Sequence, residues 1–346
     1  MIYFPADRYT DNLYNGKERE FSYANALQQG RVEEWRAGFR SRLTEMTGLA
    51  KVRSDTAGLP LSPRIVERRE YPEYVREKIY VATEPGIDIP FYLLLPAQGT
   101  GPFPLVLTPH GHGRRGKEVY VGEFESEEER RESLDGDRDI ALQAVAQGYA
   151  VMAMDVRGFW EMAREEEVGK KQNNSCDALQ KRAFLFGRTL IGERVHDMGR
   201  LIDYAATRPE IDTNRIAITG NSGGGTVSLF TAALDERIRV CVPGSYFCTF
   251  RASLLSVNHC LCNFIPGLVD LCEMYDIAGL VAPRPLLVVH GEHDSIYPAD
   301  ATREAFSHVR ELYEAIGAPD RCELYVGDGG HRYYKAPVWP FMAKYL

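Results

Sequence analysis

The spacing of apolar residues divides this chain into two parts with different periodicities. In the first part, apolar side chains recur at intervals of four, four and three residues, at Trp35, Phe39, Leu43 and Met46. This spacing places them on one face of an amphipathic helix. We therefore expect residues 1–65 to form a helical extension whose apolar face packs on the main domain.

After the extension, short apolar runs alternate with segments that are compatible with helices. The turn Glu84-Pro85-Gly86 separates the first two runs, which we expect to pair as neighbouring strands. Strands are predicted at residues 78–83, 87–96, 104–109, 150–155, 215–219, 239–243, 285–290 and 322–326. Helices are predicted at residues 140–147, in a segment that ends near 206, and at 226–234 and 299–316. This alternation predicts an α/β fold for residues 66–346, with a mostly parallel, doubly wound sheet.

Three insertions interrupt the alternation. Residues 118–138 carry interspersed acidic and basic side chains, so we expect a loop or helix face that is exposed to solvent. Residues 156–182 and 246–275 are expected to form a cap over the site, because the functional loops of a parallel sheet gather at the carboxyl ends of its strands.

The apolar run at 215–219 leads into the turn Gly220-Asn221-Ser222-Gly223-Gly224, and a helix-compatible segment follows. A Gly-x-Ser-x-Gly turn between a strand and a helix presents its serine hydroxyl above the carboxyl edge of the sheet. The glycines leave room for the tight crossing of strand and helix. Ser222 is therefore the candidate nucleophile, and a flexible glycine-rich turn is the alternative.

A serine hydroxyl needs a base, and the base needs a carboxylate that orients it. The strand at 285–290 runs into Gly291-Glu292-His293-Asp294, and the last strand runs into Gly327-Asp328-Gly329-Gly330-His331. The resulting order of serine, acid and histidine is characteristic of α/β-hydrolases. We assign His331 as the base and Asp294 as its orienting acid, with Glu292 and Asp328 as alternative carboxylates.

Acyl transfer also requires two hydrogen-bond donors directed at the developing oxyanion. The backbone N–H of Gly223, directly after the nucleophile, is the first candidate. The loop His110-Gly111-His112-Gly113 follows the strand at 104–109. The backbone N–H of His112 is therefore the second candidate, with that of Gly111 as its alternative.

Metal binding is not expected from the sequence. His110 and His112 have no third ligand at a persuasive spacing, and Cys260-x-Cys262 lacks a second pair at the spacing of zinc sites. We therefore expect neither a metal nor another cofactor.

Aromatic and cationic residues of the insertions are candidates for substrate contacts. Trp160 and Tyr246 could line a face that binds a sugar or an aryl group. Arg157 directly follows a strand and could contact a polar substrate, although a structural salt bridge is the alternative.

Composition narrows the class of function. The 346 residues are 44% hydrophobic and 26% charged, and their formal net charge of −8 argues against a nucleic-acid surface. No stretch approaches the roughly 18 apolar residues of a membrane span, and the seven cysteines fit buried free thiols. The N-terminus lacks a basic segment followed by an apolar one. We therefore expect a cytoplasmic protein that does not bind membranes; a homo-oligomer is left open.

These motifs together resemble the α/β-hydrolase superfamily over about residues 76–346. The resemblance rests on residues 197–225, His110-Gly111-His112, Met154-Asp155-Val156-Arg157-Gly158, Gly291-Glu292-His293-Asp294 and Gly330-His331. The chain is most similar to the acetyl xylan esterase and cephalosporin C deacetylase branch, with dienelactone hydrolases and prolyl oligopeptidase-type peptidases as relatives. It departs from that branch at His112, where a tyrosine is usual, at Phe159-Trp160-Glu161, where a glutamine-containing run is usual, and in its longer N-terminal extension.

The resemblance implies an α/β-hydrolase fold and a triad at Ser222, Asp294 and His331, in agreement with the reasoning from the residues. It also implies a serine carboxylic-ester hydrolase that forms an acyl-enzyme on short acyl esters, such as acetyl groups on xylan or other carbohydrates. A peptidase or amidase and a lactone hydrolase are the enzymatic alternatives. A non-catalytic ligand-binding homologue is the alternative from another class.

Overall fold

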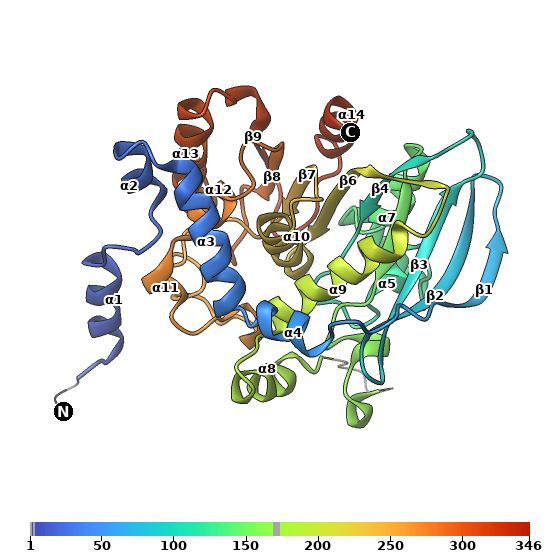
Figure 1. Ribbon diagram of the computed structural model, residues 1–346, viewed down its shortest axis with the longest axis horizontal. Helices are drawn as coiled ribbons and strands as arrows, with labels where there is room; N and C mark the ends of the chain where they lie inside the picture. Colours follow the sequence, from blue (N-terminus) through green and yellow to red (C-terminus); the bar gives the residue numbers. More distant parts are fainter. Residues whose placement is uncertain (1, 3, 169–173) are drawn as a thin grey trace.

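A nine-stranded sheet forms the centre of the computed structural model, which describes residue 2 and residues 4–168 and 174–346 (Figure 1). Its strands are β1 (Arg64–Glu70), β2 (Tyr74–Glu84), β3 (Ile87–Pro96), β4 (Phe103–Leu107), β5 (Ala150–Met154), β6 (Ile211–Asn221), β7 (Val240–Gly244), β8 (Leu286–Gly291) and β9 (Cys322–Gly327). They follow the order β1-β2-β3-β5-β4-β6-β7-β8-β9 across the sheet. Pairing is antiparallel from β1 to β5 and parallel from β5 onward. The parallel strands therefore present the loops at their carboxyl ends along one edge.

Helices cover both faces of this sheet. One face carries α3 (Val32–Met46), α4 (Leu49–Asp55), α9 (Leu190–Ala205), α10 (Gly223–Leu234), α12 (Met274–Gly279) and α13 (Ala299–Ala315). The other face carries α5 (Lys117–Tyr120), α7 (Ile140–Ala146) and α14 (Val338–Tyr345). Further helices are α1 (Asp7–Asn15), α2 (Tyr23–Gln28), α6 (Glu127–Asp135), α8 (Cys176–Leu185) and α11 (Leu268–Leu271), with short 3₁₀ turns such as η1 (Trp160–Met162) and η3 (Leu261–Asn263). Within the described residues, no helix is both long and apolar enough to cross a lipid bilayer.

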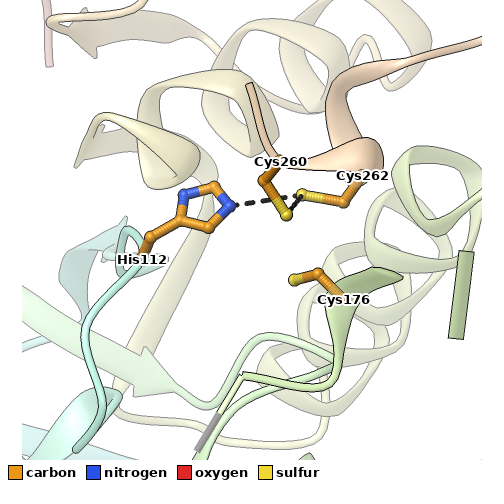
Figure 2. A group of neighbouring side chains, drawn as sticks. All are labelled: His112, Cys176, Cys260 and Cys262. Carbon is orange, nitrogen blue, oxygen red and sulfur yellow. Dashed lines mark hydrogen bonds between the residues drawn. The ribbon is translucent and has the colours of Figure 1, made fainter. Parts of the chain in front are cut away.

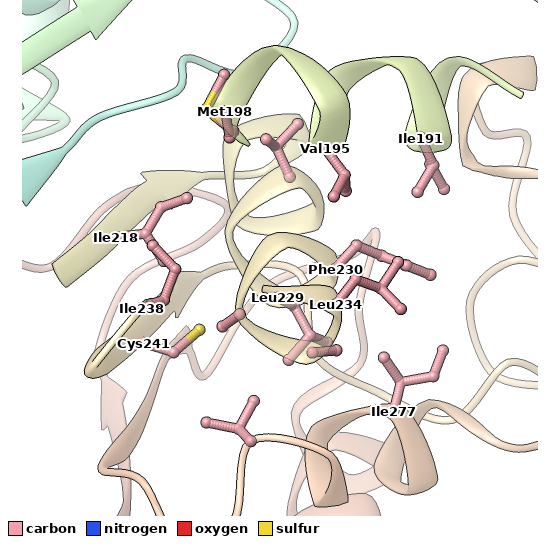
Figure 3. Packing of buried hydrophobic residues seen from close by; sticks show 14 of the residues in the cluster. Ile191, Val195, Met198, Ile218, Leu229, Phe230, Leu234, Ile238, Cys241 and Ile277 are labelled. Carbon is pink, nitrogen blue, oxygen red and sulfur yellow. The ribbon is translucent and has the colours of Figure 1, made fainter. Parts of the chain in front are cut away.

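The alternation of side chains along the strands divides the core between the two faces. In β4, Leu105 and Leu107 belong to the cluster that includes α9 and α10, while Val106 belongs to the cluster that includes α7. Figure 3 shows part of the first cluster, to which α9, β6, α10, β7, α12 and the connection between α10 and β7 contribute. The labelled residues are Ile191, Val195, Met198, Ile218, Leu229, Phe230, Leu234, Ile238, Cys241 and Ile277. This packing fixes α10, and the turn that precedes it, against the sheet.

The predicted fold class is confirmed: the chain has an α/β architecture with a mostly parallel sheet, and the predicted strands of the main domain are present. Strand β1 was not predicted. It pairs with β2 at the edge of the sheet, where Ile65 and Val66 are about half exposed among charged neighbours. An edge strand without a buried face has no alternation of apolar and polar residues to reveal it.

The predicted N-terminal helical extension consists of helices α1 to α4, which precede β1. The predicted apolar face of α3 is buried at Trp35, Phe39 and Leu43. A polar contact adds to this packing, because Nε of Arg40 donates to the Ala233 carbonyl at the end of α10 at 3.0 Å. The extension therefore covers the helical layer on one face of the sheet (Figure 1).

We predict that Phe39→Ala destabilises the whole chain. Phe39 is fully buried, and its ring stacks on that of Phe21 with 5.3 Å between the ring centres. Loss of a large buried ring leaves a cavity, so the free energy of unfolding measured by chemical denaturation should fall by about 3–5 kcal/mol. The control Arg42→Ala, at an exposed position of the same helix, should change it by less than about 1 kcal/mol. Equal effects of the two variants would contradict the observed packing.

Candidate active site

Ser222 lies at the turn between β6 and α10, where the backbone is strained. Its φ of 58° and ψ of −119° lie outside the regions that most residues adopt. The N–H of Ser222 donates to the Gly244 carbonyl of β7 at 2.8 Å, which ties the turn to the neighbouring strand. The turn therefore has the conformation of a nucleophile elbow.

The elbow fits because the residues that cross there lack side chains. A Cβ atom on Gly220 or on Gly224 would lie 2.2 or 2.1 Å from the carbonyl oxygen of Pro109. A Cβ atom on Gly111 would lie 2.6 Å from the carbonyl oxygen of Asn221. The loop after β4 thus packs directly on the elbow, backbone against backbone.

The candidate base and its acid form a hydrogen-bonded pair. Nδ1 of His331 lies 2.7 Å from Oδ2 of Asp294, and Oδ1 of Asp294 accepts the backbone N–H groups of Ile296 at 2.8 Å and Tyr297 at 3.1 Å. Burial of Asp294 favours the neutral acid, but the hydrogen bond from His331 and the backbone donors outweigh burial and lower the pKa of this carboxyl. An ionised Asp294 orients the imidazole with its proton on Nδ1, which leaves Nε2 as an acceptor.

The alternative carboxylates make other contacts. Glu292 is exposed and pairs with Arg303, and Asp328 is exposed. Across the part of the chain that the structure describes, the carboxylate within hydrogen-bond distance of the His331 ring belongs to Asp294. The geometry therefore favours Asp294 as the orienting acid.

Ser222 and His331 line the same cavity, whose volume is about 420 Å³. The rest of its wall comes from the loop after β4 (residues 110–116), from positions between 119 and 138, and from Asn221 and Ile296. A substrate in this cavity would thus reach both the candidate nucleophile and the candidate base.

The insertion at 118–138 forms one wall of this cavity, which corrects the expectation of a merely solvated loop or helix face. Its lining residues include Glu129, Glu132, Ser133 and Arg138. Their mixed charge resembles that of a solvated surface, so the pattern gave no sign of a cavity wall. None of the described residues of 156–182 or 246–275 lines the cavity, and the role of these segments as a cap stays a prediction.

The candidate oxyanion donors lie next to each other. Gly223 is the first residue of α10, so its N–H has no acceptor within the helix. The His112 ring packs over this position, because a Cβ atom on Gly223 would lie 2.8 Å from Nδ1 of His112. Gly111, the alternative donor, also lies close to the elbow, because a Cβ atom on Gly111 would lie 3.3 Å from Cβ of Ser222.

His110 anchors the same loop to the end of β5. Its Nε2 accepts the backbone N–H of Val156 at 3.0 Å, and its Nδ1 lies 2.7 Å from the Gly111 carbonyl oxygen. Burial lowers the pKa of His110 to about 3, so the ring is neutral and Nδ1 is the donor. Both ring nitrogens are therefore occupied by the backbone.

A buried ionic cluster around Lys117 fixes the other end of the loop after β4. The sequence did not predict this cluster. Nζ of Lys117 lies 2.7 Å from Asp155 and 2.6 Å from Glu161. Burial raises the pKa of Asp155 to about 6, although Lys117 acts in the opposite direction. A lysine among alternating charges gives no signal of burial, so only the folded chain shows that Lys117 joins the loop after β4 to that after β5.

Two of the predicted substrate-binding residues are buried elsewhere, and these predictions are wrong. Arg157 makes two hydrogen bonds of 2.7 Å to Asp197 and also pairs with Glu193, in the structural role that was its alternative. Tyr246 is 1% exposed, and its ring packs against that of Tyr297. Both side chains fill the interior behind the site.

Trp160 lies behind the cavity wall, and its role stays a prediction. Its Nε1 donates to Glu118 at 3.2 Å, and the Arg115 guanidinium lies 5.6 Å from its ring centre. Arg115 itself lines the cavity. Trp160 therefore contacts a lining residue, Arg115, through a cation–π interaction.

Comparisons with known proteins agree with this fold. The model of the Abhydrolase family matches residues 10–329. The protein named "Putative hydrolase YtaP" of Bacillus subtilis (strain 168) is 27% identical over 278 residues, which cover 79% of this chain and 87% of that protein. The protein named 4-O-methyl-glucuronoyl methylesterase 1 of Wolfiporia cocos (strain MD-104) is 28% identical over 169 residues, which cover 40% of this chain and 41% of that protein.

Among solved structures, a "putative acetyl xylan esterase" of Bacteroides fragilis NCTC 9343 superposes with a TM-score of 0.76 and a sequence identity of 19%. The match covers 94% of this chain and 83% of that one. At this identity the similarity establishes the α/β-hydrolase fold.

We predict that Gly111→Ala and Gly113→Ala differ sharply in stability. The new methyl group of Gly111→Ala would meet backbone at 2.6 Å, while that of Gly113→Ala would enter open space. The first should lower the free energy of unfolding by about 1–3 kcal/mol through overpacking, and the second should change it by less than about 1 kcal/mol. Chemical denaturation measures both, and equal stability would show that the loop does not press on the elbow.

Proposed function

Because the chain belongs to the Abhydrolase family, we propose that it is a serine carboxylic-ester hydrolase that works through an acyl-enzyme. One observation carries the proposal: Ser222 and His331 line the same cavity. Ser222 lies on a strained elbow, and His331 is paired with Asp294. A hydroxyl, a base and an orienting carboxylate are the groups that nucleophilic acyl transfer requires.

In the proposed reaction, Nε2 of His331 takes the proton of the Ser222 hydroxyl while the serine oxygen attacks the ester carbonyl carbon. His331 then gives this proton to the alkoxy oxygen of the substrate, so the ester bond breaks and the alcohol leaves. Water attacks the acyl-enzyme by the same route, which releases the acid and restores Ser222. Asp294 stays ionised throughout and stabilises the imidazolium.

The negative charge of the tetrahedral intermediate forms beside the start of α10. The backbone N–H groups of Gly223 and of His112, or of Gly111 in its place, are the proposed donors to this oxygen. The positive end of the α10 dipole adds to their effect. Both donors are held in place before the substrate arrives, because the loop after β4 packs on the elbow.

Short acyl esters of carbohydrates, acetyl esters first among them, are the proposed substrates. The fold shared with a "putative acetyl xylan esterase" supports this class. The cavity wall offers Arg115, Glu129 and Glu132, whose polar groups can bind sugar hydroxyls. The cavity of about 420 Å³ suits a small sugar ester better than a long acyl chain.

An ester of a sugar acid is the second candidate, and Arg138 favours it. This exposed guanidinium lines the cavity, and no carboxylate of the described residues forms an ion pair with it. Arginine binds carboxylate groups in a bidentate manner. A relative that is named a glucuronoyl methylesterase supports this class.

We also propose that the protein is cytoplasmic. Its seven cysteines are free thiols, and thiols stay reduced in that compartment.

We predict that Ser222→Ala abolishes hydrolysis of p-nitrophenyl esters. The acetate should be the fastest substrate in a series from acetate to octanoate. Ser222→Ala should lower kcat/KM at least about a thousandfold, because the nucleophile of the acyl-enzyme is lost. The control Ser228→Ala removes a hydroxyl that donates to the Gly224 carbonyl on the same helix, and it should keep near-normal activity.

Unchanged turnover by Ser222→Ala would refute the assigned nucleophile. Turnover of peptide amides but not of esters would favour the peptidase alternative. Faster turnover of a methyl glucuronate than of sugar acetates, lost in Arg138→Gln, would favour the second candidate. Ligand binding and biological activity that both survive in Ser222→Ala would favour the non-catalytic homologue.

We predict that Asp294→Asn lowers kcat about 10⁴-fold, because the amide no longer holds the imidazole in the productive tautomer. Glu292→Gln, two residues earlier in the same loop, should stay close to the wild type, since Glu292 pairs with Arg303 at the surface. Steady-state kinetics on p-nitrophenyl acetate measures both. The reverse result would identify Glu292 as the acid.

A further inference from the structure

Four side chains that bind metals well converge beside the loop after β4 (Figure 2). They are His112, Cys176, Cys260 and Cys262, and their ligand atoms all lie within 4.8 Å of one another. Nε2 of His112 is 3.3 Å from Sγ of Cys262, which is 3.3 Å from Sγ of Cys260. No step of the proposed ester hydrolysis uses these thiols.

The four residues come from three distant segments. His112 belongs to the loop after β4, Cys176 begins α8, and the Cys260-x-Cys262 pair lies at η3. Along the sequence, neither His112 nor the Cys260-x-Cys262 pair has further ligands at the spacing of a metal site. Folding brings the two together with Cys176, which their spacing did not show.

The arrangement is close to what a tetrahedral zinc ion needs. Bonds of about 2.3 Å to sulfur and about 2.0 Å to nitrogen place tetrahedral ligand atoms roughly 3.5–3.8 Å apart. Two of the separations here are 3.3 Å, and none of them exceeds 4.8 Å. Small rotations of the side chains would therefore close the site around an ion, and three sulfurs with one imidazole are a known structural zinc ligand set.

Charges around the cluster also suit a metal thiolate. A zinc ion with three thiolates and a neutral histidine carries one net negative charge. The buried Arg194 lies next to it, with Nη2 at 3.1 Å from Sγ of Cys176. Asp177 holds the segment that carries Cys260 and Cys262, because its Oδ1 accepts the N–H of Leu261 at 3.1 Å. Such outer contacts orient ligands and tune metal affinity.

We propose that His112, Cys176, Cys260 and Cys262 bind one Zn²⁺ ion that pins the loop after β4 to α8 and to the insertion at 246–275. All four positions of the ion are taken by protein, so it is structural and does not activate water. The thiol protons pass to solvent on binding. An ion can enter from the His112 side, because His112 is exposed while Cys176 and Cys262 are buried.

A disulfide within the cluster is the competing outcome. It would join two of the sulfurs at about 2.05 Å. The third thiol and the His112 ring would take no part in that bond. The convergence of all four ligand atoms on one point favours an ion.

The ion would also act on the proposed chemistry. The His112 ring would be a ligand while the backbone N–H of the same residue is a proposed oxyanion donor. Zinc would therefore make His112 a positioning residue for the oxyanion hole. This last step rests on the proposed function, whereas metal binding itself does not.

The test is metal binding by the purified full-length chain. The protein is stripped with a chelator under reducing conditions, incubated with Zn²⁺ or Co²⁺ and freed of excess metal. We expect about one zinc per chain by elemental analysis, and with Co²⁺ a visible spectrum with thiolate charge-transfer and tetrahedral ligand-field bands. A wild-type chain that retains neither metal overturns the proposal, as does a disulfide within the cluster that persists under the reducing conditions.

Variants assign the ligands. Cys260→Ser and Cys262→Ser should each weaken zinc binding about a hundredfold or more in competition with a chromophoric chelator. The control Cys322→Ser removes a buried thiol at the start of β9 and should bind zinc as the wild type does. Equal losses in Cys322→Ser and Cys262→Ser, or wild-type affinity in both cluster variants, overturn the ligand assignment. Circular dichroism checks that each variant folds, and the Co²⁺ spectrum of the wild type decides the question without any variant.

Esterase activity and zinc content, measured on the same variants, distinguish the metal-site proposal from the proposed ester hydrolysis. Ser222→Ala should lose esterase activity and keep its zinc. Cys262→Ser should lose its zinc and lower kcat more than it raises KM, because a displaced oxyanion donor acts in the transition state. Zinc binding in a chain that hydrolyses no ester would refute the proposed function and leave the metal site standing. Full esterase activity in a zinc-free Cys262→Ser would refute the positioning role of His112.

Discussion

The close approach of two backbone segments, the loop after β4 and the elbow at Ser222, is the constraint on which the candidate site depends. The Pro109 carbonyl lies where a Cβ on Gly220 or Gly224 would have to go. This contact sets the position of Ser222 relative to the loop after β4, and hydrogen bonds and ion pairs then hold the surrounding loops around it. A residue on a strained turn keeps its conformation only when the surrounding structure imposes it. At Ser222 the neighbouring backbone and the hydrogen bond from its N–H to Gly244 do so.

Polar contacts in the interior hold the remaining loops relative to this contact. His110 is held on both ring nitrogens, Lys117 joins two loops through Asp155, and Arg157 pairs with Asp197 behind the site. Buried ion pairs add little net stability, because the cost of removing charges from water offsets their attraction. Their effect here is geometric, because each contact fixes one loop at the carboxyl edge of the sheet to a neighbouring element. The proposed zinc site would fix the loop after β4 at a further point, His112.

The sequence predicted those parts of the protein whose signals are local. The glycine pattern around Ser222 and the alternating apolar strands are such signals, because a tight turn and a buried strand each require certain residue types at certain spacings. The chain order of a serine, an acid and a histidine selected Ser222 and His331, which line one cavity, and narrowed the candidate acid to carboxylates that lie between them in the sequence. The choice between Asp294 and Glu292 needed the structure, since both carboxylates follow the same strand and only one points inward.

What the sequence by itself determined is the α/β architecture, the elbow and the chain order of the candidate nucleophile, acid and base, since each depends on neighbouring residues and on strand direction. Only the tertiary structure decided which side chains surround the cavity and which are buried behind it. Arg157 and Tyr246 follow strands of the site, yet they fill the interior, while the charged segment at 118–138 forms the wall. It also decided that His112 meets three cysteines, the most distant of which lies 150 positions further along the chain. Contacts between residues so far apart depend on how loops and helices pack, and no local spacing encodes that packing.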